Sequence, residues 1–380
     1  MNQGPTPADL NELLVRELER LVLHLFPRAV KQGSEYCVGS IHGEPGQSLR
    51  INVSKGPRRG FIRDFAAGEG YDAFKLAAAV QFGGDYSRCY KWAVSWLGLD
   101  NADPARVEQV RREARADADK RAAEGAKKKA AERRKAEAIW LNARPLERGD
   151  VVDRYLLSRA IDLAELGRAP GALRFAPAHP YWRQLDNEKW EQVGVFPAMV
   201  ARIVGLDGRF IGTHQTWLKP DGSGKLGLDV IGMDWRGKPN KAKKVKAGYE
   251  GGHIKLWLGQ HPDGRRVQGP LRAMKGERLF LSEGIEDGLT AAVADPSLAV
   301  ACMINVGNIR TIELPEQARE IVLLRQNDPP GSDAERAYLA GVHRLRCDRR
   351  RVLEVTVGAG DKDINDLAQR AAQRPLARAS

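Results

Sequence analysis

The chain has 380 residues, which is long enough for two or three domains that each bury a core. Its 61 lysines and arginines against 49 acids give a formal net charge of +12, an excess that favours polyanionic partners, nucleic acid above all. Four scattered cysteines without a C-x-x-C pair argue against a disulfide framework and a conventional zinc cage. No signal-peptide pattern and no membrane-length apolar run occur, so we expect a reducing cytoplasm and no membrane partner.

The first segment has a helical pattern. Leucines recur at three- and four-residue spacing between Leu10 and Leu25, which predicts an amphipathic packing helix that Pro27 ends. Asp9 is the expected N-cap, with Glu12 three residues later as in a capping box.

Residues 34–99 predict a small α/β module. Ser48–Val53 alternates as a strand, Gly56–Gly60 is a basic turn, and Phe61–Phe65 pairs back as the second strand of a hairpin. Residues 67–76 then lead into a helix.

The order C…H-G…S-L-R-I…D-F-A-x-G-E-G-x-D-A in this module is similar to the zinc-ribbon module at the front of phage-type primases. Cys37 and His42 supply two ligands, but Arg63–Phe65 stands where further cysteines are needed. A structural zinc site requires four nitrogen or sulfur ligands. We therefore expect residues 1–100 to be a zinc-ribbon-like module that lacks most of its ligands and binds no zinc.

Basic and aromatic side chains are interleaved on this predicted hairpin. Its candidate DNA-binding residues are Arg50, Lys55, Arg58, Arg59 and Arg63. Phe61 and Phe65 lie beside them, and cations next to aromatic rings suit phosphate contact plus base stacking on single-stranded DNA. A solvated basic turn above ordinary core aromatics fits the pattern equally well.

Residues 101–138 are rich in alanine, lysine, arginine and glutamate, with almost no large apolar side chain. These residue types have high helix propensities, so the segment predicts a long, solvated, charged helical linker. Its lysine and arginine clusters leave contact with nucleic acid as an alternative to a plain spacer.

Residues 139–275 predict a mixed α+β domain with a basic surface. Val151–Arg159 is expected to be a helix, and Ala198–Val204 and Phe210–Leu218 to be strands joined by a turn at Asp207 and Gly208. A second turn, Pro220–Lys225, comes before the basic stretch Lys238–Lys246.

This order resembles the basic subdomain that precedes the catalytic domain of phage and plasmid primase-like proteins, where G-x-H-x-T-x-L…D-G-x-G-K…G-G…L recurs. In that family the subdomain forms a cleft that holds template and nucleotide. The resemblance implies that the nucleotide- or template-binding residues are His214, Lys225, Lys243, Lys244 and Lys246. The histidine as an ordinary packed residue and the lysines as a solubilising loop are the alternatives.

Residues 276–372 predict a parallel α/β sheet. Strands are expected near Leu279–Ser282, Leu298–Met303, Glu320–Leu324 and Arg351–Val357, alternating with helices. Acids follow the first, third and fourth of these strands. Because parallel strands gather their carboxyl ends on one edge, these acids should share a Mg²⁺, which prefers oxygen ligands.

These residues resemble a Toprim domain, the catalytic fold of bacterial and phage primases, topoisomerases and some nucleases. Glu283, Gly284 and Asp287 fit its first motif, and Lys362–Leu367 is similar to its last. In the middle D-x-D motif the first aspartate is replaced by Gln326, which leaves only Asp328.

The resemblance implies a DNA primase-like nucleotidyltransferase of phage or plasmid replication. Such an enzyme acts on a single-stranded DNA template with ribonucleotides or deoxyribonucleotides, Mg²⁺ or Mn²⁺, and a separate replicative helicase. Its catalytic residues would be Glu283, Asp328 and Asp363, and Asp287 and Asp366 would complete the metal site.

Gln326 keeps two alternatives open. A neutral amide still offers an oxygen but loses a full charge, which favours a weakened or inactive single-stranded-DNA-binding replication accessory. A Toprim nuclease is the third possibility, for which the primase-like basic subdomain is poor support.

Overall fold

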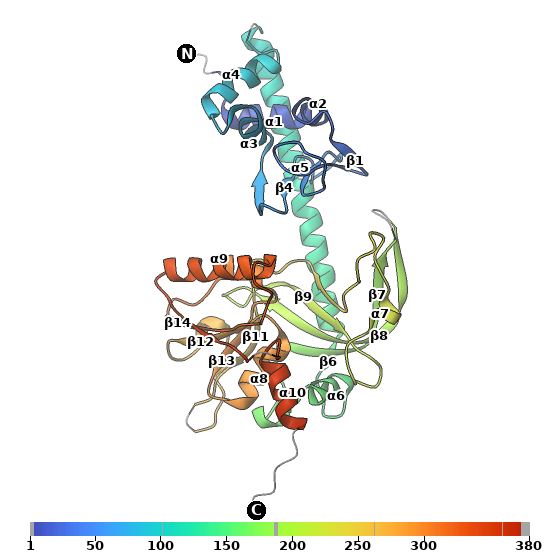
Figure 1. The fold of residues 1–380 in the computed structure, drawn as a ribbon, viewed down its shortest axis with the longest axis vertical. Coiled ribbons are helices and arrows are strands. Elements are labelled where there is room, and N and C mark those ends of the chain that lie inside the picture. Colours follow the sequence, from blue (N-terminus) through green and yellow to red (C-terminus); the bar gives the residue numbers. More distant parts are fainter. Residues whose placement is uncertain (1–3, 101, 186–188, 262, 359, 374–380) are drawn as a thin grey trace, which may run out of the picture. The chain divides into compact units, whose positions relative to one another are not determined.

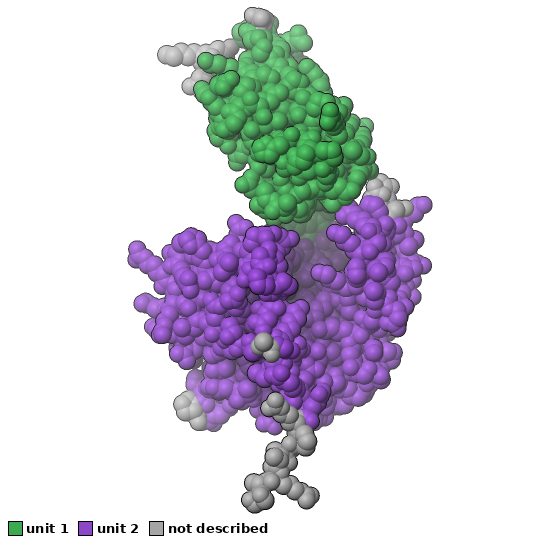
Figure 2. Space-filling view, in the orientation of Figure 1, with its two compact units in different colours: residues 1–130 green, residues 131–380 purple. Residues whose placement is uncertain are grey.

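The computed structural model describes residues 4–100, 102–185, 189–261, 263–358 and 360–373. It divides into two compact units, residues 1–130 and 131–380, which are coloured separately in Figure 2. The division falls inside helix α5 (Pro104–Asn142), so the charged segment predicted as a linker contributes residues to both units. Among the described residues, no helix combines the length and apolarity needed to span a bilayer.

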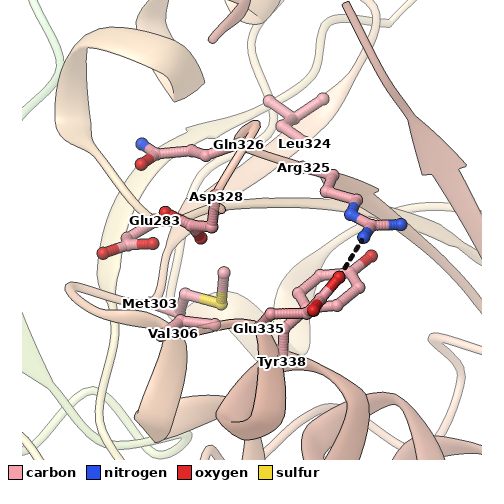
Figure 3. A pocket seen from close by; sticks show the side chains of 9 residues that line it. All are labelled: Glu283, Met303, Val306, Leu324, Arg325, Gln326, Asp328, Glu335 and Tyr338. Atoms are coloured by element: carbon pink, nitrogen blue, oxygen red, sulfur yellow. Dashed lines mark ion pairs between the residues drawn. The ribbon is translucent and has the colours of Figure 1, made fainter. Parts of the chain in front are cut away.

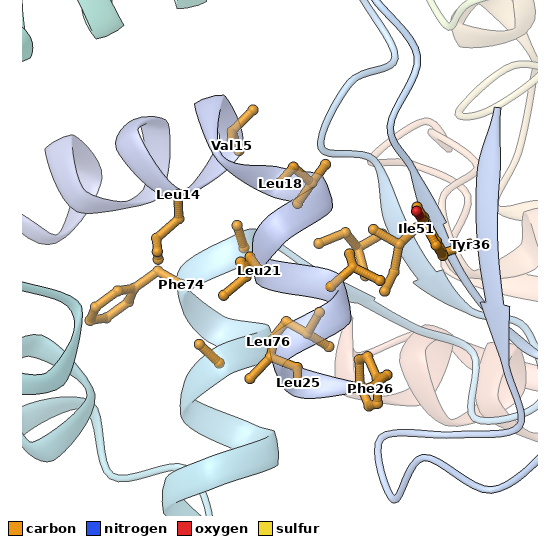
Figure 4. Close-up of a cluster of buried hydrophobic side chains, with 14 of the residues drawn as sticks. Leu14, Val15, Leu18, Leu21, Leu25, Phe26, Tyr36, Ile51, Phe74 and Leu76 are labelled. Carbon is orange, nitrogen blue, oxygen red and sulfur yellow. The ribbon is translucent and has the colours of Figure 1, made fainter. Parts of the chain in front are cut away.

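The first unit combines four helices with an antiparallel sheet. Its elements are α1 (Pro7–Arg16), α2 (Leu18–Leu25), β1 (Val30–Gln32), β2 (Glu35–Val38), β3 (Leu49–Asn52), β4 (Ile62–Asp64), β5 (Glu69–Tyr71), α3 (Ala73–Phe82), α4 (Tyr86–Trp96) and the first part of α5. The strands follow one another in the sheet, as hairpins do. The leucines predicted to form one helical stripe lie on α1 and α2 and pack against Ile51 and Leu76 (Figure 4).

The predicted N-cap of the first helix is wrong by three residues. Thr6 is the N-cap, and Asp9 is the partner in the capping box, accepting hydrogen bonds from the Thr6 backbone N–H at 2.9 Å and hydroxyl at 2.8 Å. Asp9 is buried because Arg111 and Arg115 of α5 pair with it at 3.0 and 2.6 Å. This part of α5 is therefore packed rather than wholly solvated.

The second unit begins with an antiparallel sheet in the order β10-β9-β8-β7-β6. Its elements are β6 (Arg144–Pro145), α6 (Val151–Ser158), the 3₁₀ helix η1 (Leu163–Leu166), β7 (Leu173–Gln184), β8 (Trp190–Val204), β9 (Phe210–Trp217), α7 (Leu228–Ile231) and β10 (Lys243–Lys246). The predicted helix and strands are present, and Gly208 closes the predicted turn with φ +84°.

A second sheet completes this unit in the order β11-β13-β12-β14-β15 (Figure 1). Its elements are β11 (Ile254–Leu258), η2 (Leu271–Ala273), β12 (Arg278–Ser282), α8 (Ile285–Ala294), β13 (Ala299–Cys302), η3 (Val306–Arg310), β14 (Glu320–Leu324), α9 (Asp333–Cys347), β15 (Arg351–Val355) and α10 (Ile364–Gln373). The four predicted strands are parallel, which confirms the α/β class. Strand β11 pairs antiparallel with β13 at one edge of this sheet, although the sequence analysis assigns its residues to the preceding subdomain.

Separate hydrophobic cores cover the two faces of this sheet. On one face α8 packs with apolar residues of β11, β13 and β8, so the two sheets share a core. On the other face α9 packs with Leu279, Leu281 and Ile321. The shared core brings β9 and β10 beside the carboxyl edge of the parallel strands, where the predicted acids lie.

Candidate active site

The parallel strands deliver their acids to one edge as predicted. Glu283 directly follows β12, and Asp287 lies in the first turn of α8. Gly288 lets this helix approach the sheet, because a Cβ atom there would lie 2.3 Å from Leu256 Cδ1 and 2.6 Å from Ser282 Oγ. The position of Asp287 thus depends on the glycine that follows it.

A cavity of about 630 Å³ opens at this edge. Glu283, Asp287, Gln326 and Asp363 line its acidic side. An adjoining pocket contains Glu283, Gln326 and Asp328, and Figure 3 shows the side chains of Glu283 and Asp328 projecting into it. The three predicted motifs therefore lie along the same edge, where Glu283 and Gln326 line both hollows, Asp287 and Asp363 line the cavity, and Asp328 lines the adjoining pocket.

The acids in the cavity repel one another. Burial and the nearby Asp328 raise the pKa of Glu283. Burial and Asp363 raise the pKa of Asp287 to about 7. Gln326 Nε2 donates to Asp287 Oδ2 at 3.1 Å, and the buried Oδ1 of Asp287 has no hydrogen-bond partner among the described residues. The cations near these acids, Lys243 and Lys362 among them, therefore do not offset the effect of burial and of the neighbouring carboxylates.

The donor set fits Mg²⁺ in chemistry, since carboxylate and amide oxygens are its preferred protein ligands. However, no three His, Cys, Asp or Glu side chains among the described residues form a group that could hold a metal ion. The acids instead interact as two pairs, Glu283 with Asp328 and Asp287 with Asp363. The amide nitrogen of Gln326 is directed at the second pair.

The last acidic motif has a structural role as well. Asp363 Oδ1 accepts a hydrogen bond from Asp366 N at 2.9 Å, as a helix-capping side chain does. Asp366 is outside the residues that line the cavity, and its carboxylate lies 3.6 Å from Arg159. Asp366, which was predicted to belong to the metal site, therefore forms an ion pair with Arg159 instead.

The opposite wall carries a buried carboxylate that the sequence interpretation missed. Glu286 accepts a hydrogen bond from Tyr155 at 2.6 Å and pairs with Lys225 and Lys243, each at 3.0 Å. Burial alone would raise the pKa of Glu286, but the two lysines hold it well below its usual value. The only sequence signal was an acid one helical turn after Glu283.

His214 lines the same cavity as a neutral imidazole. Burial and the neighbouring Lys243 lower its pKa to about 3, and its buried Nδ1 has no partner among the described residues. An uncharged ring here suits a hydrogen bond to a base or sugar rather than pairing with phosphate.

The predicted set of four lysines is divided between two faces. Lys225 and Lys243 face Glu286, whereas Lys246 pairs with Glu132 at 2.6 Å and Lys244 lies 3.9 Å from the Tyr181 ring. Side chains alternate along a strand, so β10 sends successive lysines to opposite sides. Of the four lysines predicted to bind nucleotide or template, Lys225, Lys243 and Lys244 line the acidic cavity, whereas Lys246 lies on the other face of the sheet.

In the first unit, the predicted hairpin presents exposed aromatic rings beside arginines. Phe61 and Phe65 are 45% and 58% exposed. Arg58 lies 5.6 Å from the Phe61 ring, and Arg50 and Arg63 lie 5.5 and 5.7 Å from the Phe65 ring. These contacts leave ring edges and cations available to a nucleic acid.

Arg59 belongs to the fold rather than to this surface. Its guanidinium donates to the carbonyl oxygens of Val15, Arg16 and Val53 at 2.9, 3.0 and 2.8 Å. These bonds satisfy carbonyls at the end of α1, which have no partner inside the helix. Lys55 lines a neighbouring hollow with Arg59.

Comparison with known families accounts for most of the second unit. Residues 130–244 match a domain of unknown function (DUF7146), and residues 278–373 match the Toprim domain. No curated protein matches the chain.

Two solved structures are similar at low identity. One is a DNA primase domain from Pseudomonas aeruginosa, with 16% identity, a TM-score of 0.31, and coverage of 52% of this chain and 61% of that one. The other is the primase fragment of the bacteriophage T7 primase-helicase protein, with 14% identity, a TM-score of 0.32, and coverage of 60% and 75%.

Proposed function

We propose that this chain, whose residues 278–373 form a Toprim domain, is a primase-like nucleotidyltransferase that extends a primer on a single-stranded DNA template. The observation that carries the proposal is the cavity in which Glu283, Asp287 and Asp363 face Lys225 and Lys243. An acidic edge opposite a basic wall complements a nucleoside triphosphate that carries divalent cations.

Each side of the cavity has a distinct part in the proposed reaction. Glu283, with its raised pKa, would accept a proton from a primer 3′-hydroxyl or would hold a cation together with Asp328. Asp287 and Asp363 would hold a second cation. When bound, Mg²⁺ or Mn²⁺ would lower the pKa of the hydroxyl and offset the charge of the triphosphate.

The basic side would orient the substrate. Lys225 and Lys243, fixed by Glu286, would contact phosphate oxygens, and neutral His214 would hydrogen-bond to a base or sugar. The setting we propose is replication of a phage or plasmid, with a separate helicase opening the duplex.

The test is primer synthesis by the full chain on single-stranded DNA with labelled ribonucleotides or deoxyribonucleotides and Mg²⁺ or Mn²⁺. We expect short products that Glu283→Gln abolishes. The matched control is Glu191→Gln, because the Glu191 carboxylate pairs with Arg183 on β7 and does not line the cavity. Cleavage of the template without primer synthesis would replace the proposal by a nuclease.

One observation favours a second candidate, a single-stranded-DNA-binding accessory without catalysis. Gln326 takes the place of an acid and donates its amide N–H to Asp287. This neutral side chain offers no negative charge to a cation. Salt-sensitive DNA binding without product, with either metal and either kind of nucleotide, would select this candidate.

A further inference from the structure

A second hollow lies on the other face of the first sheet of the second unit. Its volume is about 1010 Å³, and it is lined by β7 to β10 and the last turns of α5. On β9, His214 faces the acidic cavity, whereas Gln215 and Trp217 line this second hollow. Adjacent strand residues point to opposite faces, so the two sites lie on opposite faces of the sheet and share Lys244 and Val245 at its edge strand β10. We call the second one the tryptophan groove.

Two exposed indoles stand at this groove. Trp182 on β7 and Trp190 on β8 both line it, and they are 44% and 56% exposed. In the ladder Trp182 pairs with Gln192 and Trp190 pairs with Gln184, so the tryptophans are diagonal neighbours on one face. Two large rings left open on one sheet face form a platform for other planar rings.

The floor of the groove is held in place by its own contacts. The His179 ring stacks on Trp217 with centroids 5.1 Å apart, and Tyr181 meets Trp217 edge-on at 5.0 Å. The Trp217 indole N–H donates to the His179 carbonyl at 3.1 Å. A partner that enters the groove therefore meets a floor that is already ordered, which reduces the entropic cost of binding.

The charge of the groove is positive. The groove is lined by Lys135, Lys244 and Lys246. Glu132 pairs with two of these lysines, at 3.0 Å from Lys135 and 2.6 Å from Lys246. Burial lowers the pKa of Lys244 to about 8, so this ammonium group gains from a nearby anion. Exposed rings with three lysines match a partner that carries both planar rings and negative charge.

We propose that the tryptophan groove binds a single-stranded nucleic acid, with bases stacked on Trp182 and Trp190 and phosphates beside Lys244 and Lys246. A duplex keeps its bases stacked inside and cannot offer them to these rings. Aromatic grooves also bind proline-rich peptides, but such a peptide offers no anion to the net positive charge of the groove. The proposal is independent of nucleotidyl transfer, because it concerns the other face of the sheet.

The test uses the full chain and fluorescein-labelled 12-mers of dT and rU, a matched duplex and a decaproline peptide, with binding followed by anisotropy. The variant is Trp182→Ala/Trp190→Ala. Its matched control is Trp235→Ala, which removes an indole that is 40% exposed outside the groove. We expect the double variant to bind the single strands at least tenfold more weakly and the control to bind within twofold of the parent. The dT and rU arms show whether the strand is DNA or RNA.

Photo-cross-linking separates this groove from the arginine-rich hairpin of the first unit. A 12-mer containing 5-iodouracil should cross-link to the peptide that carries Trp182 or Trp190, and it should still do so in Glu283→Gln, which tests the proposed catalysis separately. Absence of a cross-link at both tryptophans, together with equal affinity of the double variant and the control, would overturn the proposal. Loss of decaproline binding without loss of oligonucleotide binding would also overturn it.

Discussion

Glu286 is the residue whose replacement tests the structure of the cavity most directly. Glu286→Gln keeps the shape and the acceptor for Tyr155 but removes the charge that two lysines share at 3.0 Å each. Breaking a fully buried ion pair by removing one partner costs about 3–5 kcal/mol. The two lysine side chains are each about one-third exposed and keep part of their hydration, so we expect a loss of about 2–3 kcal/mol.

The assay for this prediction is thermal unfolding of the parent and the variant, followed by tryptophan fluorescence. A loss of this size should lower the melting temperature of a unit of this length by roughly 5–10 °C. Tyr155→Phe, which removes one hydrogen bond to the charged Glu286, should cost about 1.5–3 kcal/mol. Glu191→Gln, which removes an exposed ion pair, should cost less than about 0.5 kcal/mol. A Glu286→Gln variant as stable as the exposed control would show that Glu286 does not neutralise the lysines.

Three further predictions follow from the titrating and substituted groups. The raised pKa of Asp287 favours the folded state below about pH 4, and this contribution is lost as pH rises through about 7. In metal-free buffer, Asp287→Asn should therefore raise the urea midpoint at pH 8 and change it little at pH 4. Equal effects of the substitution at both pH values would contradict this prediction. Burial raises the pKa of Asp9, but hydrogen bonds from Thr6 and Arg115 hold this pKa at about 2. The Asp9 carboxylate therefore contributes about 2 kcal/mol to the free energy of unfolding above pH 4, and this contribution is lost toward pH 2. Asp9→Asn should remove this pH dependence from the acid unfolding of the first unit. Gln326→Asp should increase the affinity for Mg²⁺, which calorimetry measures, and should increase any primer synthesis. An unchanged affinity would show that the side chain at position 326 does not bind the metal ion.

The sequence predicted the elements and the acidic edge because both depend on local patterns. Apolar runs that end in an acid, such as the one before Glu283, are strands whose tips must meet in a parallel sheet. The family resemblance supplied the pairing of this sheet with a basic subdomain. What failed were contacts between distant segments, such as Tyr155 with Glu286 and Arg59 with the carbonyls of α1. No local periodicity encodes such partners.

The lysines show the same limit at the scale of a single strand. A basic stretch looks uniform in sequence, yet in β10 Lys243 lines only the acidic cavity, Lys246 lines only the tryptophan groove, and Lys244 lines both. Which residue faces which side depends on the register with β9, where Lys243 pairs with Thr216. The sequence does not define where the turn before β10 ends, so it does not determine the register between β9 and β10.

The cations that line the cavity leave the acids at its edge only partly neutralised. Six cationic side chains line the same cavity: Arg159, Lys225, Lys241, Lys243, Lys244 and Lys362. Even so, the pKa values of Glu283 and Asp287 stay raised. The reason is that several of these cations have nearer partners, Glu286 for two of the lysines and Asp366 for Arg159. Because the cations with nearer partners leave Glu283 and Asp287 only partly neutralised, the proposed binding of a metal-bound triphosphate would supply the missing positive charge from solution.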